Sequence, residues 1–184
     1  AVEKRLEAGM GTKTGHGYMH ASFIAARLKD PDLMWRMLRD YSSLPFVNSS
    51  FITCHDPGPK IYNLDATFCL PAVLMEMLVF SEPGLIEVLP AMPSEKFRRG
   101  TLSGVLARGG ITVERLHWNL LLGHVNLTLR SQKAQKITVR SGYRLRYLQA
   151  DDPADKDLVS DRSQQFDWQV DLPAGRSVKL RFNV

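Results

Sequence analysis

The sequence lacks the features that mark several large protein classes. It has only 2 cysteines, Cys54 and Cys69, which are too few for a disulfide framework or a thiolate metal cluster, although a single bridge stays open. No apolar run approaches the roughly eighteen residues that a membrane-spanning helix needs. Lys and Arg are scattered between acidic residues, and the net charge of +5 is modest. We therefore expect neither nucleic acid nor a membrane as a partner.

The first part of the chain has the apolar spacing of helices. Apolar residues recur every three or four positions in "GYMHASFIAARL", and the next segment, "DPDLMWRMLRDY", opens with Asp30 as an N-cap and Pro31 in the first turn. A loop rich in Pro, Gly, Asn and Ser runs from Ser42 to about Asp65. A third helix is predicted over 67–81, where Pro71 is tolerated because it falls in the first turn.

After Pro83 the apolar period changes to two. The alternating segments are "GTLSGVLARGG", "ITVERLHW", "HVNLTLRS", "KITVRSGYRLRYL", "FDWQVDL" and "SVKLRFNV", separated by turn residues. Short strands at this spacing are typical of a β-sandwich, while "ADDPADKDLVSDRSQQ" is predicted to be a polar loop. We predict an α+β chain with helices over 1–82, a linker over 83–99 and an antiparallel β-sandwich over 100–184.

The third predicted helix is too apolar to stand in a three-helix unit. In the stretch "IYNLDATFCLPAVLMEML" (61–78) only Glu76 is charged after Asp65. Each buried Leu, Met or Phe side chain stabilises a protein by roughly 1.5–3 kcal/mol, so a solvent-exposed face of this kind is costly. The opening "AVEKRLEAG" also has the character of the middle of a helix. We expect the helices to be the C-terminal piece of a larger helical architecture that begins upstream of Ala1.

Two motifs resemble the end of glycoside hydrolase family 95, which includes α-L-fucosidases and some α-L-galactosidases. "NLDATFCLPAVLMEML" (63–78) is similar to the family's "QIDGNFGGTAGIAEML" without a gap. "IEVLPAMPSEKFRRGTLSGVLARGGITVERLHW" (86–118) is similar to "LLPALPxxWxxGxVxGLRARGGFxVxxxW". The pairing of LPA-x-P with ARGG is specific, and the resemblance covers roughly two-thirds of the chain.

The resemblance implies the last helices of an (α/α)6 barrel followed by a β-sandwich. It also implies an inverting glycosidase, in which a general acid protonates the leaving oxygen while water attacks the opposite face of the sugar. The family's supporting aspartate corresponds to Asp65, our candidate catalytic residue. An Asp before a helix is held ionised by the helix dipole, although Asp65 is equally suited to serve as the N-cap alone. The family's general acid, a Glu, and its asparagines are expected upstream of Ala1.

Three further residues are candidates for substrate binding. His55 stands in "TCHDPGP", where the family has "AHPP"; a surface loop histidine is the alternative. Thr67 replaces the family's asparagine, and His16 replaces its tryptophan. His16 and His20 have the spacing of metal ligands but lack the acidic third ligand of HExxH, so we expect no metal and no cofactor.

The departures from the family motif leave two functional hypotheses. Cys69 and Leu70 stand where the family has a Gly-Gly pair, and such a change narrows or reshapes a sugar pocket. The first hypothesis is an α-L-fucosidase-like fragment that acts on a glycan together with the remainder of its barrel and is inactive alone. The alternative is a non-catalytic carbohydrate-binding or scaffold fragment. A secreted or periplasmic location is favoured over the cytoplasm, although the sequence does not fix the compartment.

Overall fold

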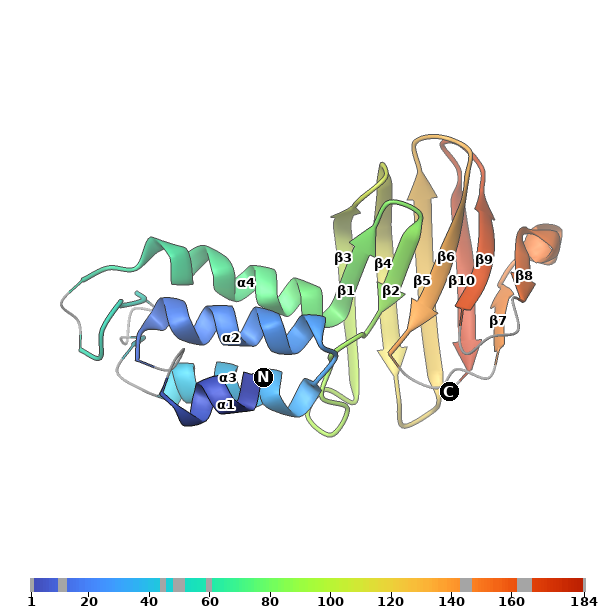
Figure 1. The fold of residues 1–184 in the computed structure, drawn as a ribbon. Helices are drawn as coiled ribbons and strands as arrows, with labels where there is room; N and C mark the ends of the chain where they lie inside the picture. The colour runs from blue at the N-terminus through green and yellow to red at the C-terminus, as the bar shows by residue number, and fades with distance from the viewer. Residues whose placement is uncertain are drawn as a thin grey trace. The chain divides into compact units, whose positions relative to one another are not determined.

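The chain divides into a helical unit and a β-unit. The computed structural model describes residues 2–9, 13–43, 46–47, 52–58, 61–142, 147–161 and 167–183. Unit 1 is Ala1–Leu78 and unit 2 is Val79–Val184. Within the described residues unit 1 contains helices and unit 2 contains the strands (Figure 1). The predicted order of helices first and strands second is confirmed.

Unit 1 contains four helices in its described residues, and side chains cap the N-termini of the last three. The helices are α1 (Val2–Glu7), α2 (Gly15–Arg27), α3 (Pro31–Ser43) and α4 (Leu64–Leu78). The hydroxyl of Thr14 accepts a hydrogen bond from the backbone N–H of Gly17 at 3.0 Å. The carboxylate of Asp30 accepts one from the N–H of Leu33 at 2.9 Å, which confirms Asp30 as the N-cap of α3.

Helix α4 begins and ends earlier than the 67–81 that the sequence predicts. The side chain of Asn63 accepts a hydrogen bond from the N–H of Ala66 at 3.2 Å, so Asn63 is the capping residue. The chain leaves the helix after Leu78 because the next residues pair in a sheet. Pro71 therefore lies inside α4, whereas the sequence predicted that it falls in the first turn. The helix lacks the hydrogen bond that a backbone N–H at this position would donate.

Helix α2 packs against both α3 and α4 (Figure 1). The aromatic rings of Tyr18, Tyr41 and Phe46 form a buried cluster with centroid distances of 5.5 to 6.2 Å. Large apolar side chains on or next to α2 and α4 are exposed, among them Ile24, Leu28, Leu64, Phe68 and Leu74. Unit 1 thus has a core beside α2 and an open apolar surface.

Unit 2 consists of two five-stranded sheets. The first has the order β1-β2-β6-β9-β8 and the second the order β3-β4-β5-β10-β7. The strands are β1 (Val79–Glu82), β2 (Leu85–Val88), β3 (Arg99–Ala107), β4 (Ile111–Asn119), β5 (His124–Ser131), β6 (Gln135–Ser141), β7 (Tyr147–Ala150), β8 (Val159–Asp161), β9 (Asp167–Leu172) and β10 (Ser177–Asn183). Neighbouring strands in the described residues run antiparallel except β2 and β6, which are parallel.

Two segments differ from the prediction. The predicted linker over 83–99 contains β2. Strand β1, which precedes β2, belongs to the same sheet, so unit 2 starts at Val79 and not after a linker. Strands β1 and β2 are short and join through a tight turn at Gly84, whose φ is +81°. The predicted polar loop after Ala150 contains a 3₁₀-helix (Pro153–Leu158) and β8. Asp152 caps that 3₁₀-helix through the N–H of Ala154.

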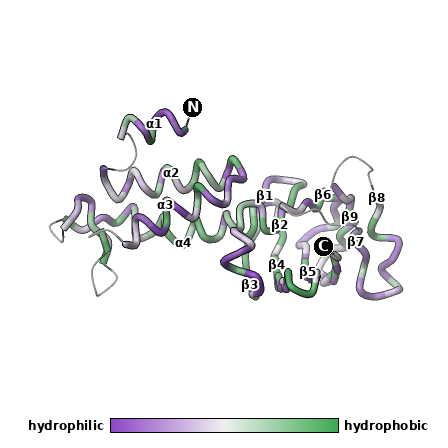
Figure 2. Tube along the Cα trace, turned by 90° about the horizontal axis from the view of Figure 1, so that it is seen from below, coloured by the Kyte–Doolittle hydropathy of each residue, from purple (hydrophilic) through white to green (hydrophobic). Residues whose placement is uncertain are grey.

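The two sheets lie as layers, seen edge-on in Figure 2 with β1, β2, β6 and β9 on one side and β3, β4 and β5 on the other. Apolar side chains from both layers fill the space between them. Trp168 on β9 and Phe182 on β10 meet edge to face with centroids 5.8 Å apart. Trp118 and Trp168 are each 5% exposed, which agrees with the core positions that the alternation predicts.

The residues that carry the sequence resemblance have structural roles in unit 2. Leu89, in the LPA-x-P motif, is fully buried and has a positive φ of 54°. Gly109 and Gly110, in ARGG, have φ of 81° and 72° and form the turn between β3 and β4, a conformation that other residues rarely adopt. The indole N–H of Trp118 donates a hydrogen bond to the carbonyl of Phe97 at 2.8 Å. These motifs therefore identify a fold more directly than they identify chemistry.

The longest helix of the described residues, α4, has 15 residues. None of the described helices combines the length and the apolar character needed to cross a bilayer.

Candidate functional site

The start of α2 is joined to the loop that carries His55. The backbone N–H of Gly15 donates to the carbonyl of His55 at 2.8 Å, and the N–H of His55 donates to the carbonyl of Ile61 at 2.9 Å. A Cβ at Gly15 would lie 2.5 Å from the carbonyl oxygen of Cys54, so only glycine permits this approach. The backbone of His55 is therefore fixed beside the N-terminus of α2, while its side chain is exposed.

Asp65 lies in the first turn of α4, two residues after the cap. Its side chain is 72% exposed, and the capping hydrogen bond comes from Asn63 instead. The suggestion that Asp65 is the N-cap is therefore wrong. A carboxylate in the first turn is still stabilised by the partial positive charge of the helix N-terminus. Asp65 is thus available for contacts outside its own helix.

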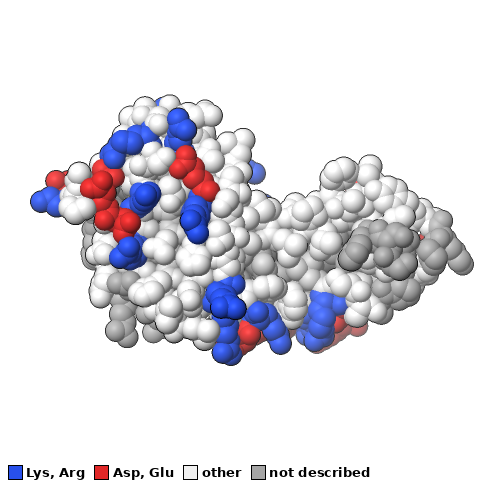
Figure 3. Space-filling view, turned by 180° about the vertical axis from the view of Figure 1, so that it is seen from behind, with Lys and Arg blue, Asp and Glu red and all other residues white. Residues whose placement is uncertain are grey.

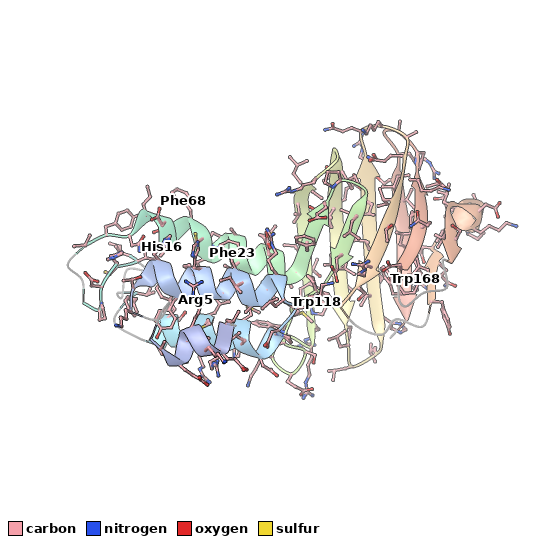
Figure 4. All side chains as sticks on the ribbon, in the orientation of Figure 1. Arg5, His16, Phe23, Phe68, Trp118 and Trp168 are labelled. Atoms are coloured by element: carbon pink, nitrogen blue, oxygen red, sulfur yellow. The ribbon has the colours of Figure 1, made fainter. Side chains whose placement is uncertain are left out.

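Helices α2 and α4 enclose an open hollow of about 530 Å³, which we call the α2–α4 hollow. Its polar lining includes His16, His20, Arg27 and Asp65. Its other lining residues are Phe23, Ile24, Leu28 and Cys69. Figure 4 shows His16 and Phe23 extending from α2 and Phe68 from α4. The site therefore combines an ionisable end with an apolar wall.

The two candidates His16 and Asp65 meet at the edge of this hollow. Nδ1 of His16 lies 3.7 Å from Oδ2 of Asp65, which is an ion-pair distance when the imidazole is protonated and too long for a hydrogen bond. The rings of His16 and His20 lie 4.8 Å apart. Among the described residues no group of three His, Cys, Asp or Glu side chains is placed to hold a metal ion.

The thiol of Cys69 lies in the same hollow. Burial raises its pKa above the ordinary value, and the nearby carboxylate of Asp65 raises the pKa further. The thiol is therefore predominantly protonated at neutral pH, which lowers its nucleophilicity. Cys69 acts as a small wall residue here, in the place where the family motif has glycine.

Thr67 lies in a different environment. Its hydroxyl is 2.7 Å from the hydroxyl of Thr53 and 3.2 Å from both the hydroxyl of Tyr62 and the carbonyl of Asn63. These contacts attach the loop before α4 to the first turn of that helix. The structure thus brings His16 and Asp65 together, keeps His55 on the neighbouring loop, and engages Thr67 in loop packing.

Several residues of the hollow were not singled out as site residues by the sequence. Phe23 and Ile24 border the apolar stripe of this helix, which predicts core positions for them, yet Ile24 is 39% exposed. Arg27 lies among them and forms a bidentate ion pair with Glu76 of α4. The charge of Arg27, one helical turn after Phe23 and Ile24, was the sequence feature that could have indicated that this part of α2 borders solvent.

Comparison with known proteins agrees with this organisation. Residues 80–172 match the family model described as glycoside hydrolase family 95, C-terminal domain. The chain is 40% identical over 122 residues to "Alpha-L-fucosidase 2" of Arabidopsis thaliana, an alignment that covers 61% of this chain and 14% of that relative. The chain thus spans only a small part of the length of the relative it matches. The resemblance of its motifs is confirmed, and the chain belongs to glycoside hydrolase family 95.

Proposed function

We propose that this chain is the C-terminal part of an inverting glycosidase that hydrolyses a terminal α-L-fucosyl residue, or a related α-L-galactosyl residue, of a glycan. Family membership and the fucosidase relative support the reaction class. The single structural observation that carries the site is that His16 and Asp65, on different helices, meet at one hollow.

Helices α2, α3 and α4 would form part of an (α/α)6 barrel. The apolar side chains exposed on α2 and α4 support this, because burying them against further helices would add roughly 1.5–3 kcal/mol per side chain. The chain covers 14% of the fucosidase relative, which leaves ample length for the remaining helices. In that assembly the open side of the α2–α4 hollow would be closed by protein, and Asp65 would become less exposed.

In the proposed mechanism Asp65 accepts hydrogen bonds and does not itself give a proton to the leaving oxygen. Its carboxylate, stabilised by the N-terminus of α4, would orient the amide groups that hold the attacking water. The general acid would be a carboxylic acid from outside residues 1–184, across the sugar at the roughly 6.5–9.5 Å separation of inverting enzymes. His16 would contact a sugar hydroxyl beside Asp65, and His55 would do so from the adjoining loop. Thr67 would support the loop and contact sugar only at the margin of the site.

The test uses the full-length protein and an aryl α-L-fucoside. We expect Asp65→Asn to lower kcat by about 100-fold or more, the usual effect of losing a group in acid–base chemistry. Asp32→Asn is the matched control, because Asp32 is also an exposed acidic residue in the first turn of a helix and lies on α3. A loss of less than about tenfold in Asp65→Asn would refute the catalytic role. Proton NMR of the first product formed should show the β-anomer, the mark of inversion.

A second candidate function is a non-catalytic carbohydrate-binding or scaffold fragment. Cys69 supports it, because the side chain occupies space in the hollow where the family motif has glycine. Under this alternative, the full-length protein would bind an α-L-fucoside in calorimetry yet release no fucose. Restoring turnover by Cys69→Gly would identify the side chain that blocks the pocket.

A further inference from the structure

The outer face of the sheet β3-β4-β5-β10-β7 carries a second hollow, of about 370 Å³, which we call the sheet-face hollow. It lies wholly within unit 2. Figure 3 views the sandwich from this side, where Lys and Arg side chains gather beside Asp and Glu. Strands β4, β5 and β10 form the floor of the hollow, and the residue after β7, Asp151, borders it.

A β-bulge decides which side chains face this hollow. The pairing of β4 with β5 shifts between Val113 and Arg115. Val113 and Leu116 are both buried although they are three residues apart, so the bulge reverses the alternation. Arg115 and His117 consequently project from the outer face, on the same side as the polar residues of β5 and β10.

Strand register then arranges six polar side chains in two rows across three neighbouring strands. The rows are Arg115–Thr128–Lys179 and His117–Asn126–Arg181. Since neighbouring strands lie about 4.8 Å apart, the ends of each row are about 10 Å apart. The hydrogen-bonded strands hold these positions rigidly, which favours a preformed binding site.

The cations that line the hollow differ in whether they form an ion pair. Arg181 forms an ion pair with Asp151 at 2.5 Å. Arg115 and Lys179 have no acidic partner in the part of the chain that the structure describes. Two cations on either side of Thr128 repel each other, and an anion placed between them would remove that repulsion.

Further hydrogen-bonding groups lie beside the two cations. Nδ1 of His117 is 2.9 Å from the hydroxyl of Thr101, which orients the ring and leaves Nε2 for a ligand. The amide of Asn126 and the hydroxyl of Thr128 line the same hollow. Amide, hydroxyl and imidazole groups beside two cations suit a ligand that carries both hydroxyl groups and one acidic group.

We propose that the sheet-face hollow binds an acidic saccharide. Its carboxylate or sulfate would lie between Arg115 and Lys179, where a guanidinium can make bidentate hydrogen bonds to it. The hydroxyl groups of the sugar would contact Asn126 and His117. This site belongs to unit 2, and its test is independent of the hydrolysis proposed for the helical unit.

The experiment is isothermal titration calorimetry of the full-length protein, produced in a bacterium, with trigalacturonate as the probe. Fully methyl-esterified trigalacturonate is the uncharged counterpart, and sodium sulfate tests whether a free anion is sufficient. The variant is Arg115→Gln/Lys179→Gln, which removes both unpaired cations. The matched control is Lys133→Gln/Lys156→Gln, which removes two exposed cations from other parts of unit 2. Far-UV circular dichroism and thermal melts establish that each variant is folded.

We expect trigalacturonate to bind and the Arg115→Gln/Lys179→Gln variant to bind it at least about tenfold more weakly. The control variant should bind as tightly as the unmodified chain, and the methyl ester at least about tenfold more weakly. The proposal is overturned by absence of binding at millimolar trigalacturonate, by equal binding to the two variants, or by equal binding of the ester. It is also overturned if sulfate binds as tightly as trigalacturonate, or if a single-stranded oligonucleotide binds more tightly through the same two cations.

Discussion

Nδ1 of His16 on α2 lies 3.7 Å from Oδ2 of Asp65 on α4, and both side chains remain substantially exposed, at 47% and 72%. The pair lies at the N-terminal ends of two helices that pack against each other. Partial positive charge from both helix ends therefore acts on the same carboxylate. This arrangement stabilises an anion at the mouth of the hollow without burying it, so Asp65 can interact with a group from outside unit 1.

Asp65 should contribute little to the stability of unit 1, whereas Asn63 should contribute more. Asn63→Ala removes the capping hydrogen bond of α4 and should destabilise the chain by about 1 kcal/mol. Asp65→Asn alters an exposed side chain and should change the free energy of unfolding by at most about 0.5 kcal/mol. Urea unfolding monitored by circular dichroism measures both. Equal destabilisation by the two variants would show that Asp65 has a structural role.

Cys69 should react slowly with alkylating reagents at neutral pH. Burial, and secondarily the charge of Asp65, raise the pKa of its thiol, so the reactive thiolate becomes abundant only at higher pH than for a free cysteine. Rates of iodoacetamide modification from about pH 7 to pH 10 give the midpoint. Asp65→Asn should lower that midpoint and raise the rate at neutral pH.

The second cysteine provides the control for this measurement. Cys54 is 3% exposed, so a Cys69→Ser variant should show almost no modification. Asp32→Asn should leave the Cys69 midpoint unchanged because Asp32 is on α3. A midpoint below that of a free thiol, or no response to Asp65→Asn, would contradict the assigned causes.

Arg176 should matter more for stability than its exposure suggests. Asp155 in the 3₁₀-helix has a side chain only 7% exposed, and its carboxylate lies 2.8 Å from the guanidinium of Arg176. Arg176→Ala leaves a buried carboxylate without its partner and should destabilise unit 2 by about 2 kcal/mol. The variant Arg176→Ala/Asp155→Asn removes the charge as well and should recover part of that loss. Guanidinium chloride unfolding distinguishes the two, and a double variant less stable than Arg176→Ala would oppose this account.

The strands were predictable because their side chains alternate between core and solvent. The period of two identified the β-rich half, and local capping identified the start of α3 at Asp30. Strand β1 was missed because "VF" (79–80) continues the apolar run of α4, and nothing in that pattern marks the change from helix to strand. The parallel pairing of β2 with β6 was missed because it joins segments about fifty residues apart, a relationship that local periodicity does not contain.

The site was predictable only in part. The family motif pointed to Asp65, and the substitution at position 16 pointed to His16, but the contact between them depends on how α2 packs on α4. Thr67 also looked suited to sugar binding by its position after Asp65, yet its hydroxyl is engaged by Thr53 and Tyr62. Side-chain type and spacing indicated which groups were near the helix ends, and only tertiary packing decided which of them faced the hollow.

Replacement of Gly142 by alanine should damage unit 2 far more than the same replacement of Gly175. A Cβ at position 142 would lie 2.3 Å from the carbonyl oxygen of Leu89 and 2.9 Å from Cα of Pro90, and neither backbone atom can move without displacing the buried LPA segment. Gly142→Ala should therefore destabilise unit 2 by about 3 kcal/mol or more. Gly175 has a positive φ of 69°, and a Cβ added there would meet no atom within 4 Å, so Gly175→Ala should cost only the conformational strain of about 1 kcal/mol. Guanidinium chloride unfolding measures the loss of stability in each variant. If Gly175→Ala were the more destabilising, backbone conformation rather than the close approach of Gly142 to Leu89 would limit the stability of the sandwich.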